Sequence, residues 1–195
     1  MKLHTSTTRR WLDAVLADFG AFLVDHAACE RKAMSTGMHL VVKYPDRTWI
    51  LEPAIEFAKE ELDHFQKVAR LVAKRGLLLA PDIELPYIAA LLEHARHGRN
   101  ERLVDRLLVS AIFEARGCER FGMLATTLPE GEERALFEEL TRADARHQRL
   151  FVDLAVRALP GDAAGAVESR LEELLDLEAE IVTRLPVGPA LYAGT

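Results

Sequence analysis

The stretch LLLAPDIELP, residues 77–86, separates the predicted helices of this chain into two pairs. It is the longest segment without a helical period, and Pro81 and Pro86 limit helix formation within it. On both sides, almost every long segment repeats its apolar residues with a helical period. No segment alternates convincingly between apolar and polar residues, as a half-buried strand would. The sequence therefore predicts an all-α protein with one long connection near its middle.

Four long helices and three shorter ones are expected. The long helices are predicted at residues 21–43, from 46 or 53 to 75, 99–127 and 130–159, and the others at residues 9–17, 87–96 and 162–184. Short links join the long helices within each pair, whereas the crossover between the pairs is long. This connectivity is typical of a ferritin-like four-helix bundle, here with extra short and C-terminal helices in a single domain over residues 1–195.

The bulk composition is that of a globular protein. The 195 residues are 49% hydrophobic and 29% charged, which is enough apolar material for one sizeable core. No apolar run reaches the roughly 18–20 residues of a spanning helix, and the N-terminus lacks the apolar middle of a secretory signal. With only 2 cysteines, reduced thiols are expected rather than a disulfide framework. We therefore expect a cytoplasmic protein that has no membrane partner.

Two pairs of the type acid-x-x-histidine lie within the long helices. KEELDHF contains Glu61 and His64 three positions apart, and ADARHQ repeats the spacing with Asp144 and His147. Residues at i and i+3 share one face of a helix. A single pair of this type is most often a solvated surface feature. Two pairs at similar depths in their helices indicate instead that both face a common positively charged partner.

Each pair follows a glutamate on the other helix of its hairpin. Glu30 precedes Glu61 by 31 residues, and Glu114 precedes Asp144 by 30. The neighbours of Glu114 on its helix face are small and almost uncharged, as a buried ligand requires. Glu119 is an alternative to Glu114, because the tripeptide CER surrounds both Glu119 and Glu30 and would align these two. Depth within the helix favours Glu114.

Four carboxylates and two imidazoles in this pattern match the di-iron or di-manganese carboxylate arrangement of helical bundles. The candidate ligands are Glu30, Glu61, His64, Glu114, Asp144 and His147. Two divalent ions bring a charge of +4 into a low-dielectric interior, which four carboxylates neutralise. Each imidazole supplies a terminal nitrogen. The pattern alone is compatible with iron storage, peroxide reduction, radical generation or hydroxylation.

Longer sequence motifs narrow the choice among these functions. LVDHAACERKA, EELDHF, IFEARGCERF, ADARHQRLF and the loop KYPDR resemble the bacterial tRNA hydroxylase family over most of the chain, from Trp11 to the end of the fourth long helix. Members of that family hydroxylate the isopentenyl group of 2-methylthio-N6-isopentenyladenosine at position 37 of tRNA. The resemblance implies a non-haem di-iron monooxygenase that uses two iron ions, O2 and two external electrons.

The resemblance also sets expectations about partners and about one departure from the pattern. The chain has no C-x-x-C pair, so we expect the electrons to come from a separate reductase. The expected nucleic-acid partner is the anticodon loop of tRNA, not DNA. At position 144 an aspartate stands where a glutamate is expected. Its side chain is one methylene shorter, so it is expected to bind one iron terminally rather than to bridge both.

A group of arginines after the crossover is the candidate RNA-binding feature. Arg96, Arg99 and Arg102 are close enough in sequence to grip backbone phosphates, although such clusters are more often solvated helix faces. The net charge of −6 does not exclude a local phosphate-binding patch. Two other functions remain open from the residues: a ferritin-like di-iron oxidase acting on a small molecule, and an iron-binding or storage protein without oxygenase chemistry.

Overall fold

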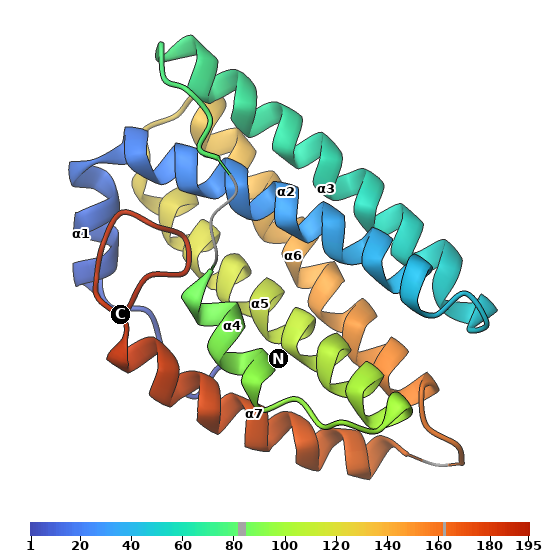
Figure 1. Ribbon diagram of the computed structural model, residues 1–195. Helices are drawn as coiled ribbons and strands as arrows, with labels where there is room; N and C mark the ends of the chain where they lie inside the picture. Colours follow the sequence, from blue (N-terminus) through green and yellow to red (C-terminus); the bar gives the residue numbers. More distant parts are fainter. Residues whose placement is uncertain (82–84, 162) are drawn as a thin grey trace. The chain divides into compact units, whose positions relative to one another are not determined.

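The computed structural model describes residues 1–81, 85–161 and 163–195, and all regular structure in these residues is helical, as predicted. The helices are α1 (Arg9–Ala17), α2 (Phe19–Lys43), α3 (Thr48–Lys74), α4 (Pro86–Glu93), α5 (Arg99–Thr127), α6 (Glu132–Arg157) and α7 (Ala164–Arg184) (Figure 1). They form two compact units. One contains α2, α3 and the segment Pro189–Leu191, and the other contains α4 to α7 with both chain termini.

In the first of these units, α2 and α3 lie side by side as an antiparallel hairpin (Figure 1). The C-terminal end of α3 returns to the start of α2, where the guanidinium of Arg75 lies 5.3 Å from the ring centroid of Phe19. The helix predicted from residue 21 begins two residues earlier, at Phe19. Asp18 caps α2 by accepting a hydrogen bond from the backbone of Ala21 (2.9 Å), so Gly20 lies inside the helix.

A glycine sets the distance between α2 and α3. A Cβ atom at Gly37 would lie 2.7 Å from the carbonyl oxygen of Ala54 and 3.0 Å from the Cβ of Ala58. Both distances are shorter than ordinary van der Waals contact, so only glycine fits at this crossing. The close approach brings the facing side chains of the two helices within reach of one another.

In the other unit, α5 and α6 form a second antiparallel hairpin. The ring of Phe121 on α5 packs against that of Phe137 on α6 with centroids 5.6 Å apart, and one turn earlier on α5 the thiol of Cys118 donates to the carbonyl of Thr141. Both cysteines of the chain are free, as expected. The two hairpins and the long segment between them reproduce the predicted connectivity, although residues 82–84 of the crossover lie outside the described residues.

The helices α4 and α7 pack against α5 and against each other. A predicted helix over residues 87–96 was too long at its C-terminal end, because α4 stops at Glu93. The backbone N–H of Arg96 donates instead to the carboxylate of Asp105 on α5 (2.8 Å), which turns the chain away from a helical path. The start predicted for the last helix, residue 162, lies outside the described residues. The C-terminal end predicted for it, residue 184, is confirmed.

A fully buried ion pair joins α5 to α7. The guanidinium of Arg116 donates to both carboxylate oxygens of Glu178 at 2.7–2.9 Å, and both side chains are completely shielded from solvent. A bidentate pair of this kind is expensive to break, because either partner alone would be a buried uncompensated charge. Within the described part of the chain, no helix combines the length and the apolar character needed to cross a membrane.

Candidate metal centre

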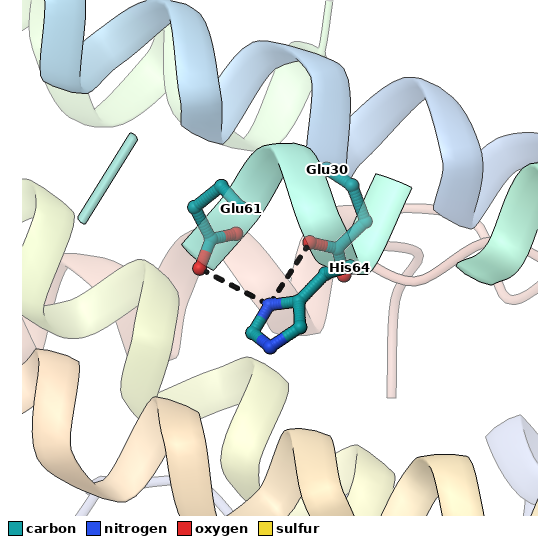
Figure 2. Close-up of side chains that lie close together, drawn as sticks. All are labelled: Glu30, Glu61 and His64. Carbon is teal, nitrogen blue, oxygen red and sulfur yellow. Dashed lines mark ion pairs between the residues drawn. The ribbon is translucent and has the colours of Figure 1, made fainter. Parts of the chain in front are cut away.

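The hairpin of α2 and α3 carries a buried group of three ligand-type side chains, here called the α2–α3 cluster: Glu30, Glu61 and His64. One ligand atom from each residue lies within 4.8 Å of the other two. Nδ1 of His64 is 3.4 Å from Oε1 of Glu61 and 3.8 Å from Oε2 of Glu30 (Figure 2). All three residues are at most 5% exposed. The sequence analysis named these three residues, and the structure brings them together.

Helix geometry explains this placement. Glu61 and His64 are one turn apart on α3, so both point to the same side, and Glu30 reaches them from the neighbouring α2 (Figure 2). The other charged residues of the KEELDHF motif lie on other faces of the helix. Lys59 and Asp63 are exposed and form surface ion pairs with Glu56 and Lys67.

A further histidine, His26, forms a hydrogen bond with one residue of the α2–α3 cluster. Nε2 of His26 lies 2.5 Å from Oε1 of Glu30, one turn along α2, and the imidazole is completely buried. Burial and the nearby His64 lower the pKa of His26 to about 3, so the ring is neutral. A carboxylate oxygen only accepts hydrogen bonds, which identifies Nε2–H of His26 as the donor. The position of His26 one turn before Glu30 is the sequence signal for this contact.

The hairpin of α5 and α6 carries a second group, the α5–α6 cluster: Glu114, Asp144 and His147. Nδ1 of His147 lies 3.3 Å from Oε2 of Glu114. Asp144 and His147 share one face of α6, and all three residues are at most 5% exposed. The two hairpins therefore each provide an i, i+3 acid–histidine pair and one glutamate from the partner helix, as the spacing predicts.

The carboxylate of Asp144 depends on the absence of a side chain at Gly117. A Cβ atom at residue 117 would clash with the Oδ2 atom of Asp144. A glycine in the middle of α5 costs about 0.5–1 kcal/mol relative to alanine. The missing side chain leaves room for the carboxylate of Asp144 beside the backbone of α5.

Glu119, the alternative to Glu114, has other partners. Its carboxylate accepts hydrogen bonds from the backbone N–H of Thr7 (3.1 Å), from the Thr7 hydroxyl and from Arg116 (2.6 Å). It thus ties the N-terminal segment to α5 and forms part of the ion network around Arg116. Of the two glutamates, Glu114 is the one that faces His147.

Both clusters have the chemistry of a site for divalent metal ions. The oxygen-to-nitrogen distances of 3.3–3.8 Å exceed the usual N–H···O hydrogen-bond length of about 2.9 Å, as expected for atoms that converge on a shared ion. Buried carboxylates are costly unless their charge is compensated, and divalent cations compensate it. Carboxylate oxygens together with imidazole nitrogens suit iron among the common metals. The residues present therefore fit an iron centre.

The three arginines predicted to contact RNA lie near the start of α5 in different environments. Arg96 is bound to the fully buried Asp105 through its backbone and through its guanidinium, at 2.7 Å for the shortest contact. Arg99 and Arg102 lie in the first turn of α5 and are exposed. Arg96 therefore has a structural role within its unit, whereas Arg99 and Arg102 are exposed at the surface.

The chain is similar to proteins of one known family. The family model described as tRNA-(MS[2]IO[6]A)-hydroxylase matches residues 1–192. A protein named tRNA 2-(methylsulfanyl)-N(6)-isopentenyladenosine(37) hydroxylase from Pseudomonas putida is 38% identical over 153 residues, covering 78% of this chain and 74% of that protein. A protein of the same name from Salmonella typhimurium is 24% identical over 229 residues, covering 92% of this chain and 83% of that protein.

A solved structure agrees with the fold assignment. The chain is similar to "Protein 43 with aldehyde deformylating oxygenase activity from Synechococcus", with a TM-score of 0.90, 30% sequence identity and coverage of 98% of this chain and 96% of that chain. The fold predicted from the helix connectivity, an all-α ferritin-like fold, is thereby confirmed.

Proposed function

The chain belongs to the tRNA-(MS[2]IO[6]A)-hydroxylase family, and we propose that it hydroxylates the isopentenyl group of 2-methylthio-N6-isopentenyladenosine at position 37 of tRNA. The match of the family model over nearly the whole chain is the observation that carries this proposal. The reaction is an O2-dependent oxidation of an allylic methyl group, which requires a strong metal-based oxidant. The α2–α3 cluster and the buried pair of Glu114 and His147 supply ligands of the kind that such an oxidant needs.

We propose that the α2–α3 cluster and the α5–α6 cluster each contribute three ligands to a di-iron centre. When bound, the iron ions supply the activation of O2 that inserts one oxygen atom into the substrate C–H bond. The protein contributes charge balance and orientation: four carboxylates against two divalent ions, and one imidazole nitrogen from each histidine. His26 fixes the carboxylate of Glu30 by its hydrogen bond, a contact of the type that commonly orients metal ligands.

Asp144 gives the proposed centre an asymmetry. Its short side chain brings the carboxylate close to the backbone of α5, where Gly117 leaves room for it. Glu61, in the corresponding position of the other hairpin, has one more methylene and a longer reach. We propose that Asp144 is a terminal ligand of one iron, whereas the glutamates are the residues able to bridge.

The proposed reaction also requires partners. O2 is the co-substrate, and two electrons per hydroxylation come from a separate reductase. The enzyme acts in the cytoplasm on the anticodon loop, whose modified adenine is presented as an unstacked single-stranded base, the usual form in which proteins read RNA bases. The exposed Arg99 and Arg102 are the candidate phosphate contacts, whereas Arg96 supports the loop before α5 through Asp105.

Nucleoside analysis of a deletion strain tests this function in the cell. Deleting the gene should remove the hydroxylated isopentenyladenosine from host tRNA and leave its 2-methylthio precursor in its place. A plasmid copy should restore the modification. A copy with His64→Ala should fail to restore it, and a copy with the exposed Arg184→Ala should succeed. An unchanged nucleoside profile in the deletion strain would defeat the substrate assignment.

The structural similarity to the Synechococcus protein favours a second candidate, a ferritin-like di-iron oxidase acting on a small molecule such as an aldehyde. The same ligand set would serve both reactions, so the metal centre does not separate them. The deletion strain does: for a small-molecule oxidase the tRNA nucleosides of the deletion strain stay unchanged. Purified protein would then consume O2 with an aldehyde and not with tRNA.

A further inference from the structure

A groove of about 750 Å³ lies in the unit that contains α4 to α7, and the proposed reaction gives it no role. Its walls are α6, α7 and the N-terminal residues 1–4. The volume is within the range of about 300–1,000 Å³ that is typical of sites for small organic groups. The groove shares α6 with the α5–α6 cluster but uses another face of that helix, because Gln148 lines it and the neighbouring His147 does not.

The N-terminal wall of the groove is fixed to the rest of its unit. The imidazole of His4 lies between two acids of α7, with Nδ1 2.8 Å from Oδ1 of Asp176 and Nε2 3.2 Å from Oε2 of Glu172. In the next residue, the carbonyl of Thr5 accepts a hydrogen bond from the buried guanidinium of Arg116 (2.8 Å). The groove is therefore a formed feature of the folded chain.

A buried acceptor without a donor belongs to the lining of the groove. Gln148 is 8% exposed, and its Oε1 atom is buried and accepts no hydrogen bond from any described residue. Buried polar atoms in native proteins are almost always paired, because an unpaired one is unfavourable. A ligand that satisfies this atom has to bring an N–H or O–H group into the groove.

The rim of the groove carries charges of both signs. Lys2 and Arg149 are exposed, and among the residues that the structure describes neither is paired with an acid. Asp153 on α6 and Glu168 on α7 are exposed acids of the same rim. The two cations suit an anionic group of a ligand, and the two carboxylates accept hydrogen bonds from its N–H or O–H groups.

The rest of the lining is mostly apolar, with Val152 on α6 and both Leu171 and Leu175 on α7. The ligand that fits therefore has an anionic group, hydrogen-bond donors and an apolar body. A simple anion lacks the donors, a simple cation meets the two cations of the rim, and a fatty chain leaves the polar groups unsatisfied. A nucleotide has all three parts: a phosphate, the N–H and O–H groups of base and ribose, and the flat face of the base.

The exposed face of α6 extends the cationic rim beyond the groove. Arg142, Arg146 and Arg149 lie at i, i+4 and i+7 and are all exposed, so they form one stripe along the helix. A free mononucleotide in the groove has a phosphate only for the arginine at the rim, whereas a polynucleotide has further phosphates for the stripe. The stripe therefore favours a nucleotide that is part of an RNA chain.

We propose that this groove binds one nucleotide of the RNA substrate other than the modified adenosine, with its base at Gln148 and its phosphate at Lys2 and Arg149. The inference rests on the proposed function for the identity of the RNA. Single-stranded RNA is commonly recognised through splayed bases whose edges form hydrogen bonds with the protein. The groove thus adds the recognition of a base to the phosphate contacts proposed for Arg99 and Arg102.

Binding of an anticodon stem-loop RNA, followed by fluorescence anisotropy, tests the two parts of the site separately. Gln148→Leu keeps the approximate size of the side chain but removes the acceptor, so the affinity should fall about 3–10-fold without a change in salt dependence. Arg149→Gln should reduce the slope of log affinity against log salt concentration by about 0.7. Arg184→Gln removes the same charge at an exposed site on α7 and should change neither quantity.

Abasic substitutions in the stem-loop identify the nucleotide. Removal of one base at a time should reveal a position other than 37 at which the affinity of the wild-type protein falls. The same RNA change should have no further effect on Gln148→Leu, because that contact is already absent. Equal losses in both proteins at every position would overturn the proposal. Iron content and circular dichroism of Gln148→Leu and Arg149→Gln show that each variant is folded.

Free nucleotides distinguish the two possible sources of the ligand. Adenosine 5′-monophosphate and cytidine 5′-monophosphate should compete with the stem-loop for the wild-type protein. A nucleotide that binds through Gln148 without weakening stem-loop binding would overturn the assignment to RNA. Absence of any stem-loop binding would refute the proposed function together with this inference, whereas equal stem-loop binding by the wild type, Gln148→Leu and Arg149→Gln would refute the groove alone.

Discussion

Any side chain at residue 117 would collide with the carboxylate of Asp144, so that carboxylate keeps its position only because residue 117 is glycine. Asp144 is the proposed ligand that replaces an expected glutamate. Gly117, which it contacts, is a glycine in the middle of α5. A shorter acid needs a closer helix surface, and Gly117 provides it. The two residues therefore act as a matched pair, and their relation gives the sharpest structural prediction.

Gly117→Ala should displace Asp144 and weaken metal binding. The new Cβ would collide with Oδ2 of Asp144, so the carboxylate has to rotate away from its ligand position. Changes that disturb a ligand in this way typically cost about 10–100-fold in metal affinity. Iron content after dialysis against a chelator series measures the loss.

Gly122→Ala is the control for this prediction. It lies on the same helix, and its Cβ would meet only the methyl carbon of Thr141 at 3.8 Å. Alanine there should leave iron binding unchanged and raise the free energy of unfolding by about 0.4–1 kcal/mol. Equal iron content in the two variants would contradict the role given to Gly117.

His26→Phe should also weaken iron binding without exposing the core. Phenylalanine fills the space of the buried imidazole but cannot donate to Oε1 of Glu30, which loses its 2.5 Å contact. We expect a decrease of about 10–100-fold in metal affinity. Isothermal titration with ferrous iron under anaerobic conditions measures it. The exposed His97→Phe serves as the control, and a wild-type affinity in His26→Phe would show that Glu30 needs no such support.

Substitution of the two candidate glutamates separates metal binding from structure. Glu114→Ala should lose bound iron with only a small change in stability of the metal-free protein. Glu119→Ala should keep its iron, but lose about 1–3 kcal/mol of unfolding free energy because Thr7 and Arg116 lose their acceptor. Iron analysis together with urea unfolding of both apoproteins measures the two quantities. Loss of iron in Glu119→Ala alone would reverse the assignment.

Asp105→Asn should destabilise the protein in a manner that depends on pH. Burial raises the pKa of Asp105, but the hydrogen bonds from Arg96 and Arg170 outweigh it and lower the pKa below its ordinary value of 3.8. The stabilisation is therefore complete above that ordinary value and is lost as pH falls through the lower folded-state value. At neutral pH we expect a loss of about 2–3 kcal/mol, less than for a fully buried pair because Arg96 is partly exposed.

Urea unfolding of the wild type and of Asp105→Asn over a range of acidic to neutral pH checks this prediction. The difference in unfolding free energy between the two proteins should shrink as the solution becomes more acidic. A difference that stays constant over the whole range would mean that the charge of Asp105 contributes nothing, and that the asparagine acts through packing alone.

Arg99→Ala and Arg102→Ala should weaken tRNA binding and flatten its dependence on salt. Each lost phosphate contact should reduce the slope of log affinity against log salt concentration by about 0.7–0.9. Filter binding with an anticodon stem-loop at several salt concentrations measures the slope. Arg184→Ala, at an exposed site on α7, is the control. A slope that is equal in all three variants would remove these arginines from the RNA-binding surface.

Much of the fold and of the site was accessible from the sequence, because both rest on short-range helical geometry. The i, i+3 spacing placed Glu61 with His64 and Asp144 with His147, and the nearly equal offsets placed Glu30 and Glu114 opposite them. Contacts between side chains from distant segments could not be predicted from the sequence. The hydrogen bond from Arg96 to Asp105 ends α4 early. The Arg116–Glu178 ion pair, together with Tyr87, joins three helices. Neither interaction has a local sequence signal.

Hydroxylation of the isopentenyl group on tRNA with O2 can be tested directly on the purified protein. Purified protein loaded with ferrous iron, a chemical reductant and isotopically labelled O2 is incubated with tRNA that carries 2-methylthio-N6-isopentenyladenosine, and the nucleosides are analysed by mass spectrometry. We expect a hydroxylated nucleoside that contains the labelled oxygen, and no product with Glu114→Ala. Unmodified substrate, or a product whose oxygen comes from water, would contradict it.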